Sequence, residues 1–252
     1  LLLSVVIARD CARPDVHLGA DLGVSQVRQM HCFRAAAQFR LLELHEVADV
    51  GGLFHHRAHA QQVAALSARY RVIAPDLLGL GDTQVSLEQD YRLPKSRDMV
   101  IGLMNALGID KAHIVGHDHG GAILQLMMNS HPEKIRTATL TNVEAYDQWP
   151  SKPELKYLIA TQNAFTNPIF WGFLHSGTVA AKVFSIATYD DNALTAEDIQ
   201  AFTRAHISTP ERWKRLQRFF RWQLDPEHNQ VTMHAVEGMR KFTKPTLILW
   251  GK

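Results

Sequence analysis

The stretch HIVGHDHGGAILQ, residues 113–125, decides the fold, because it joins an apolar strand to an apolar helix through a short glycine-rich turn. Asp118 stands at the tip of this turn, with Gly116 and Gly120 two positions away on either side. When a strand is followed by the sequence Gly-x-nucleophile-x-Gly and then by a helix, the central side chain projects from the carboxyl edge of the sheet. The free N–H groups of the helix can then stabilise a developing negative charge. Asp118 is therefore the candidate nucleophile, and no Gly-x-Ser-x-Gly occurs in the chain.

Strands and helices alternate on both sides of this turn. Compact apolar or β-branched runs predict the strands, and apolar side chains at helical spacing predict the helices. Such alternation is typical of a parallel sheet with helices on its faces. The strands are expected at 1–7, 39–45, 71–76, 112–117 and 134–142, and the helices at 56–70, 96–108 and 121–131.

The pattern changes after Asn142, where helices continue but no convincing strand follows until about Met239. Four of the five tryptophans lie in this part of the chain. The segment KPTLILWGK, residues 244–252, then predicts an apolar, core-type strand. A helical block that interrupts a parallel sheet indicates a cap over its active edge. We therefore expect a core at 1–145, a helical cap at 146–239 and the last core strand at 240–252.

Composition limits the classes of function. With 252 residues, 46% hydrophobic and 21% charged, the chain fits one large α/β domain with an inserted subdomain. A net charge of +2 does not favour a nucleic-acid partner, and the basic amphipathic segment 211–222 is interpreted as a solvated face over an apolar stripe. Cys11 and Cys32 form no disulfide framework or metal-ligand spacing. The opening LLLSVVIA lacks the features of a signal peptide or membrane span, so a cytoplasmic protein without membrane contact is expected.

From about Leu41 to Val143, and again from Lys244 to Gly251, the chain resembles the α/β-hydrolase superfamily. The resemblance is to the branch with an aspartate nucleophile, which includes epoxide hydrolases and haloalkane and haloacetate dehalogenases. Its most specific pieces are YRVIAPDLLGLGDT (70–83) and HIVGHDHGG. The resemblance implies an α/β-hydrolase fold with an inserted helical cap. It also implies that Asp118 attacks a small apolar organic substrate to give an ester, which a His-activated water hydrolyses without a cofactor.

The resemblance also assigns roles to other residues. The oxyanion hole would use the backbone N–H groups of His119, after the nucleophile, and Val47, in LHEVADVGG (44–52) where the family commonly has His-Gly-x-Pro. Epoxide hydrolases protonate the epoxide oxygen with cap tyrosines, which slightly favours epoxide opening over dehalogenation here. The substrate-binding candidates, which include those tyrosines, are His45, Tyr146, Tyr157, Tyr189 and Trp171.

The chain departs from the family pattern in its acid and its base. The family commonly places the acid after the strand matched by TLILWG and the base His after one further strand, whereas this sequence ends at Lys252. The acid can also follow the strand that ends at Asn142, where Glu144 and Asp147 are the nearby substitutes. We therefore expect a truncated copy, or a fragment, of a hydrolase that turns its ester over slowly.

Three alternatives compete with an enzymatic nucleophile at Asp118. His117 and His119 could bind a metal, but the sharp turn from strand to helix works against their converging on one ion, so no metal is expected. The turn could also be purely structural. Lastly, the chain could be a non-catalytic binding protein that retains the turn and a pocket. His117 itself is expected to be a packed strand-end residue.

Overall fold

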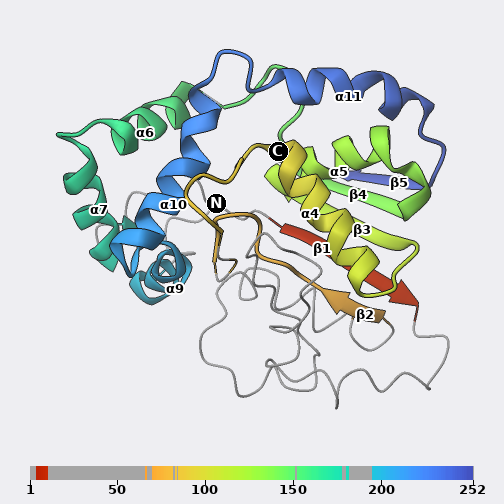
Figure 1. The fold of residues 1–252 in the computed structure, drawn as a ribbon, viewed down its shortest axis with the longest axis horizontal. Helices are drawn as coiled ribbons and strands as arrows, with labels where there is room; N and C mark the ends of the chain where they lie inside the picture. Colours follow the sequence, from red (N-terminus) through yellow and green to blue (C-terminus); the bar gives the residue numbers. More distant parts are fainter. Residues whose placement is uncertain are drawn as a thin grey trace.

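The computed structural model describes residues 4–10, 66, 70–81, 83, 85–150, 152–177, 180–181 and 195–251. The strand expected at 39–45 lies outside the described residues, as does the helix expected at 56–70 apart from Leu66. Five strands form one sheet in the order β2-β1-β3-β4-β5 (Figure 1). Their bounds are β1 Ser4–Asp10, β2 Tyr70–Ile73, β3 Ala112–Asp118, β4 Ile135–Val143 and β5 Thr246–Leu249.

The sheet is mostly parallel, as the alternation of strands and helices predicted. β3, β4 and β5 are parallel neighbours. β1 is antiparallel to both β2 and β3, so that Ile7 pairs with Ile73 on one side and with Ile114 on the other. β2 and β3 consequently run in the same direction, and their carboxyl ends lie at the same edge of the sheet.

In Figure 1, α4 and α5 lie beside the sheet, whereas α6, α7, α9 and α10 lie together to one side of it; we call these four helices, with η4, the cap. α5 begins directly at the turn after β3, and every residue from His119 to Met128 is buried, which explains its nearly continuous apolar sequence. α4 begins at Leu93, earlier than expected, because Leu93 is fully buried and Pro94 fits the first turn of a helix. The bounds are α4 Leu93–Ala106, α5 His119–Ser130, η2 Pro132–Lys134, α6 Lys152–Gln162, α7 Asn167–His175, α9 Ala196–Ile207, α10 Pro210–Arg221, η4 Trp222–Leu224 and α11 Gln230–Lys241.

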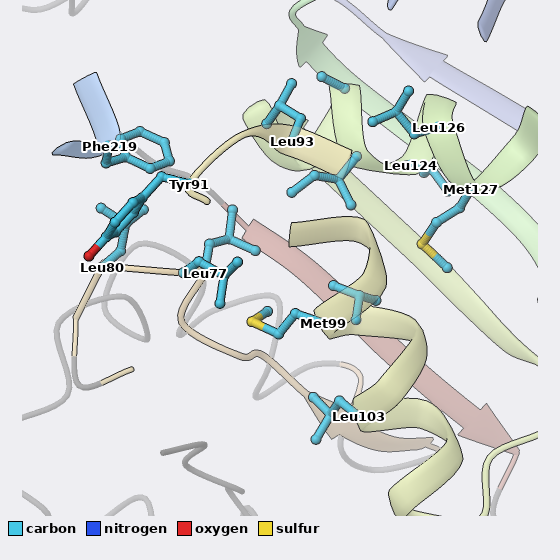
Figure 2. Packing of buried hydrophobic residues seen from close by; sticks show 14 of the residues in the cluster. Leu77, Leu80, Tyr91, Leu93, Met99, Leu103, Leu124, Leu126, Met127 and Phe219 are labelled. Carbon is cyan, nitrogen blue, oxygen red and sulfur yellow. The ribbon is translucent and has the colours of Figure 1, made fainter. Parts of the chain in front are cut away.

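The cap packs on the core through α10. Its buried face carries Trp213, Leu216 and Phe220, which confirms the apolar stripe expected at 211–222. Phe219 of the same helix belongs to one continuous buried cluster with residues of the core (Figure 2). The other members labelled in Figure 2 are Leu77, Leu80, Tyr91, Leu93, Met99, Leu103, Leu124, Leu126 and Met127.

α11 lies against α5 in the core, although it falls inside the segment 146–239 expected to form the cap. The two helices approach closely at Gly238, where an added Cβ atom would stand 2.0 Å from Oδ1 of Asn129. Between 144 and 239, the described residues form helices and no strand, as expected. No helix in the described part of the chain is both long and apolar enough to cross a membrane.

β5 corrects one expectation. The apolar run 244–252 was expected to be a core-type strand, but all four residues of β5 are exposed, and Ile248 is 64% exposed. The reason is its place in the sheet: β5 lies at the edge and, among the described strands, pairs only with β4. Apolar composition identified the strand but did not reveal which of its faces the fold covers.

Candidate active site

The turn that presents Asp118 is held by close packing of glycines. Asp118 has φ 54° and ψ −124°, an uncommon conformation for a residue with a side chain. An added Cβ at Gly116 would lie 2.6 Å from the carbonyl oxygen of Gly120, and one at Gly121 would lie 2.0 Å from Cγ1 of Val143. Glycine at these positions lets the start of α5 pack directly on β3 and β4, which fixes Asp118 at their carboxyl ends.

The Asp118 side chain is accessible and ionised. It is 27% exposed, whereas the side chain of the adjacent His119 is only 3% exposed. Burial by itself would raise the pKa of Asp118, but the hydrogen bond from His119 and the positive charge of that ring lower it below the ordinary value. Asp118 is thus a carboxylate at neutral pH, which is the form that can act as a nucleophile.

His119 lies between two carboxylates. Its Nδ1 is 3.1 Å from Oδ1 of Asp118 and 2.9 Å from Oε2 of Glu144, and hydrogen-bond geometry is met toward Asp118. Burial opposes the charged ring, but the negative charge of Glu144 and the hydrogen bond to Asp118 outweigh it and raise the pKa of His119 to about 10. The site therefore contains an imidazolium cation between Asp118 and Glu144.

Glu144 is the first residue after β4, and its backbone is fixed to the turn. Its N–H donates to the carbonyl of Asp118 at 3.4 Å, and its own carbonyl accepts from Nε2 of Gln125 at 2.7 Å. Its side chain is 10% exposed. Burial, followed by the negative charges of Asp118 and Glu154, raises the pKa of Glu144 to about 7 despite the opposing effect of His119.

Of the acids considered near the end of β4, Glu144 is the one whose carboxylate lies beside His119, at 2.9 Å from its Nδ1. Asn142 instead accepts the N–H of Gly251 on its Oδ1 at 2.8 Å. Asp147 is exposed and accepts from Nε2 of Gln148 at 2.6 Å. The sequence signal for Glu144 was its place directly after a strand whose carboxyl end lies beside that of β3.

Three aromatic rings surround the ring of His119, and we call them the aromatic cage. Trp149 follows β4, whereas Phe219 and Trp222 belong to α10 and η4 of the cap; their ring centroids lie 5.9, 5.2 and 6.0 Å from that of His119. Aromatic faces stabilise a nearby cation. Nε2 of His119 and Nε1 of Trp222 are buried without a hydrogen-bond partner. The cap therefore reaches the residue next to the nucleophile, a role that sequence analysis did not assign to these aromatics.

The remaining candidates for the oxyanion hole and for substrate binding either lie outside the described residues or, within them, make no hydrogen bond or ring contact with the residues around Asp118. His45, Val47 and Tyr189 lie outside the described residues. Tyr146 is 50% exposed and Tyr157 is 41% exposed. Within the described part of the chain, no hydrogen bond or ring contact joins these two tyrosines or Trp171 to the residues around Asp118. Trp171 donates from Nε1 to the carbonyl of Ile207 inside the cap. The substrate-binding roles of these residues stay predictions.

The side chains around Asp118 are also the ones that could bind a metal ion among the described residues. Asp118, His119 and Glu144 offer one donor atom each within 4.8 Å of one another, so they are the described residues that could hold an ion. Their mutual contacts already pair one cation with two carboxylates. His117 takes no part, since its Nδ1 lies 2.8 Å from the carbonyl oxygen of Thr141 in β4. This confirms that His117 is a packed strand-end residue.

Comparisons with known proteins identify the fold family. Residues 49–252 match the family model described as the alpha/beta hydrolase fold. The 2-hydroxymuconate semialdehyde hydrolase of Pseudomonas sp. (strain CF600) is 36% identical over 132 residues, covering 52% of this chain and 42% of that protein. Haloalkane dehalogenase 2 of Mycobacterium bovis is 22% identical over 199 residues, covering 75% of this chain and 64% of that protein.

Solved structures show the same fold. A variant of the meta-cleavage product hydrolase CumD from Pseudomonas fluorescens has a TM-score of 0.62 and 26% identity, covering 78% of this chain and 66% of the other. The haloalkane dehalogenase DbeA from Bradyrhizobium elkani has a TM-score of 0.57 at 20% identity, covering 76% and 67%, a likeness of fold alone. The chain thus spans less than half of the semialdehyde hydrolase, and about two thirds of each solved structure. Because the family model covers most of the chain, the protein belongs to the α/β-hydrolase fold family.

Proposed function

We propose that this protein is a hydrolase that uses Asp118 to open an epoxide or displace a halide through an ester intermediate. The observation that carries the proposal is an ionised, partly exposed carboxylate at the tip of the turn between β3 and α5. A purely structural aspartate in the interior would instead be buried and fully paired. The resemblance of the sequence to the aspartate-nucleophile branch supports the same chemistry.

The first step needs no base, because Asp118 is already ionised. A carboxylate oxygen forms a bond to a saturated, electrophilic carbon of a small organic substrate. The bond from that carbon to the halogen or epoxide oxygen breaks, and the leaving group takes the electron pair. A halide departs as an anion, whereas an epoxide oxygen also needs a proton, for which the cap tyrosines Tyr146, Tyr157 and Tyr189 are the predicted donors. The product is an ester on Asp118.

The test is covalent capture. The purified chain is incubated with styrene oxide or 1-bromobutane, digested, and analysed by mass spectrometry. We expect the adduct on the peptide that contains Asp118, and no adduct there in Asp118→Asn, which tolerates the positive φ of this position. Asp110→Asn, at an exposed aspartate before β3, is the matched control and should keep the adduct. A chain that forms no adduct with any electrophile is instead the non-catalytic binding protein considered above.

A second candidate is hydrolysis of an acyl substrate, which is favoured by the likeness to meta-cleavage product and 2-hydroxymuconate semialdehyde hydrolases. Attack of a carboxylate on a carbonyl gives a mixed anhydride rather than an ester, which makes an aspartate a less suitable nucleophile for this reaction. Release of p-nitrophenol from p-nitrophenyl butyrate, lost in Asp118→Asn, would favour this second candidate over the first.

A further inference from the structure

The outward faces of α6 and α7 are apolar although they are exposed to solvent. The two helices meet at the edge of the cap that lies away from the sheet (Figure 1). Their exposed side chains include Leu155 (38%), Ile159 (52%), Phe165 (86%) and Ile169 (73%). Single exposed apolar residues are ordinary, but several gathered on one surface indicate a contact with a partner.

The apolar residues of α6 share one side of the helix. Leu155 and Ile159 are four positions apart, and Lys152 and Lys156 have the same spacing, so all four project from neighbouring positions on that side. All four are exposed. Leu158, on another side of the helix, is buried within the cap, where α6 packs on α7 and α10.

The turn between the two helices and the start of α7 extend this surface. Phe165 lies in the turn, four positions before Ile169 in the first turn of α7. No charged residue occurs from Tyr157 to Leu174 in the sequence. The outer cap face, as we call this surface, consists of Lys152, Leu155, Lys156, Ile159, Phe165 and Ile169.

The charges on the outer cap face are positive. Its two lysines, Lys152 and Lys156, stand beside the apolar side chains of α6. Glu154 is the single acidic residue of α6 and projects from a different side of the helix, and its charge acts on Glu144 at the active site. The outer cap face thus combines apolar side chains with cations, and its electrostatic complement is an anionic surface with an apolar interior.

We propose that the outer cap face docks on membranes that contain anionic phospholipids. Phe165 and Ile169 enter the boundary between headgroups and acyl chains, and Lys152 and Lys156 bind the negatively charged headgroups. Docking of this kind is peripheral, and no helix crosses the bilayer. It departs from the expectation of no membrane contact, which was drawn from the opening segment LLLSVVIA.

A second copy of the chain is a poorer complement for the same face. In a symmetric contact, each face meets an identical face. The outer cap face carries two lysines and no acid to pair with them, so two such faces repel one another. The docking goes beyond the proposed function and does not depend on it. Apolar organic compounds concentrate in lipid, so a docked hydrolase would meet such substrates where they are most abundant.

Vesicle flotation tests the docking. The purified chain is mixed at low salt with vesicles of phosphatidylcholine and phosphatidylserine, and separately with vesicles of phosphatidylcholine alone. We expect binding to the mixed vesicles that weakens as salt is added. Lys152→Gln and Lys156→Gln should each weaken this binding about fivefold, and Phe165→Ser about tenfold or more.

The matched control is Ile248→Ser, at a 64% exposed apolar residue of β5, which should bind as the parent chain does. Phe165 and both lysines are exposed, so these variants should fold, and circular dichroism spectra equal to that of the parent chain would verify it.

Each other outcome overturns the proposal. No flotation with the mixed vesicles, or equal flotation with both kinds of vesicle, excludes docking on anionic lipid. Flotation that Phe165→Ser leaves unchanged, or that Ile248→Ser lowers to the same extent, excludes the outer cap face as the docking surface. Sedimentation velocity without lipid tests the other occupant: self-association that Phe165→Ser removes would assign this face to a second copy.

Discussion

The position of Asp118 depends on close packing in the first turn of α5. Gly121 lies against Val143, and an alanine there would place its Cβ 2.0 Å from Cγ1 of that valine. Gly121→Ala must therefore push α5 away from β4, and overpacking of this kind costs about 1–3 kcal/mol. We expect a lower midpoint in urea denaturation and loss of the Asp118 adduct.

Gly172→Ala is the matched control, because Gly172 lies inside α7 and an added Cβ would meet nothing within 4 Å. Alanine is a better helix former than glycine by about 1 kcal/mol, so this variant should be equally or more stable than the parent chain. If Gly121→Ala proved as stable as Gly172→Ala, the close contact between α5 and β4 would not constrain the turn.

The three charged groups at the site make stability depend on pH. His119 has its ordinary pKa of 6.5 raised to about 10, so the stability it contributes is complete below pH 6.5 and is lost as pH rises through 10. Glu144, with its pKa raised from 4.5 to about 7, binds its proton more tightly when folded, and its ionisation lowers stability as pH rises from 4.5 to 7.

Thermal unfolding measured across this range should therefore show a midpoint that falls as pH rises from about 5 to about 10. In Glu144→Gln, the midpoint of thermal unfolding should no longer fall between pH 4.5 and pH 7, because residue 144 then has no carboxyl group to ionise. A parent chain whose midpoint rises over the same window would contradict the assignment of these protons.

Among the elements, α10 joins the cap to the core. Arg212 of this helix donates from Nη1 to the carbonyls of Gly81 at 2.8 Å and Ala205 at 2.6 Å. Gly81 in turn donates its N–H to Nδ1 of His206 in α9 at 3.2 Å. One cationic side chain thus bonds the turn after β2, the end of α9 and α10 together.

We expect Arg212→Lys to loosen the cap, because both bonds come from the terminal Nη1 atom and the nitrogen of lysine lies one bond closer to the backbone. Hydrogen bonds from a charged donor contribute about 1.5–3 kcal/mol each. Hydrogen–deuterium exchange should then be faster at the backbone amides of α9 and α10 and unchanged at those of β3 and β4. Arg221→Lys, at an exposed arginine at the end of the same helix, should leave exchange as it is.

The sequence predicted most elements because their signals are local. The strands at β2, β3 and β4 and the helices α4 and α5 each carry an apolar run or period bounded by a turn residue. The exposure of β5 was missed, since it depends on which neighbours a strand has. The proximity of α11 to α5 was missed for the same reason: it brings together residues about 110 positions apart, such as Asn129 and Gly238.

The site was predictable to a similar extent. The glycine-flanked aspartate was correctly expected at the turn between a strand and a helix, where the structure has Asp118, and its role as nucleophile stays a prediction. The contact of His119 with Glu144 was not predicted, because only the backbone N–H of His119 was assigned a role, in the oxyanion hole, and its side chain was not. The aromatic cage was missed as well, since Trp149 is about 70 residues away in the sequence from Phe219 and Trp222.

Across the molecule as a whole, the edge formed by β5 presents exposed apolar side chains. Leu247, Ile248, Leu249 and Trp250 are 52, 64, 50 and 62% exposed. Exposed edge strands with apolar side chains promote pairing between chains. The chain of 252 residues should therefore self-associate as its concentration rises.

Sedimentation velocity over a concentration series would measure this, and Ile248→Lys should shift the distribution toward monomer. A charge on an edge strand opposes pairing. The matched control is Ile169→Lys, at a 73% exposed residue of α7 in the cap. If both substitutions acted alike, general solubility rather than the β5 edge would explain the association.

The aromatic cage has an optical consequence. Protonated imidazole quenches indole emission at short range, and the rings of Trp149 and Trp222 lie 5.9 and 6.0 Å from that of His119. Both indoles are therefore dim while His119 is charged. Any event that removes that charge, or that draws the cap away from α5, brightens them. We therefore expect the emission of these two of the five tryptophans to follow the charge of His119 and the contact between the cap and α5, with no label attached.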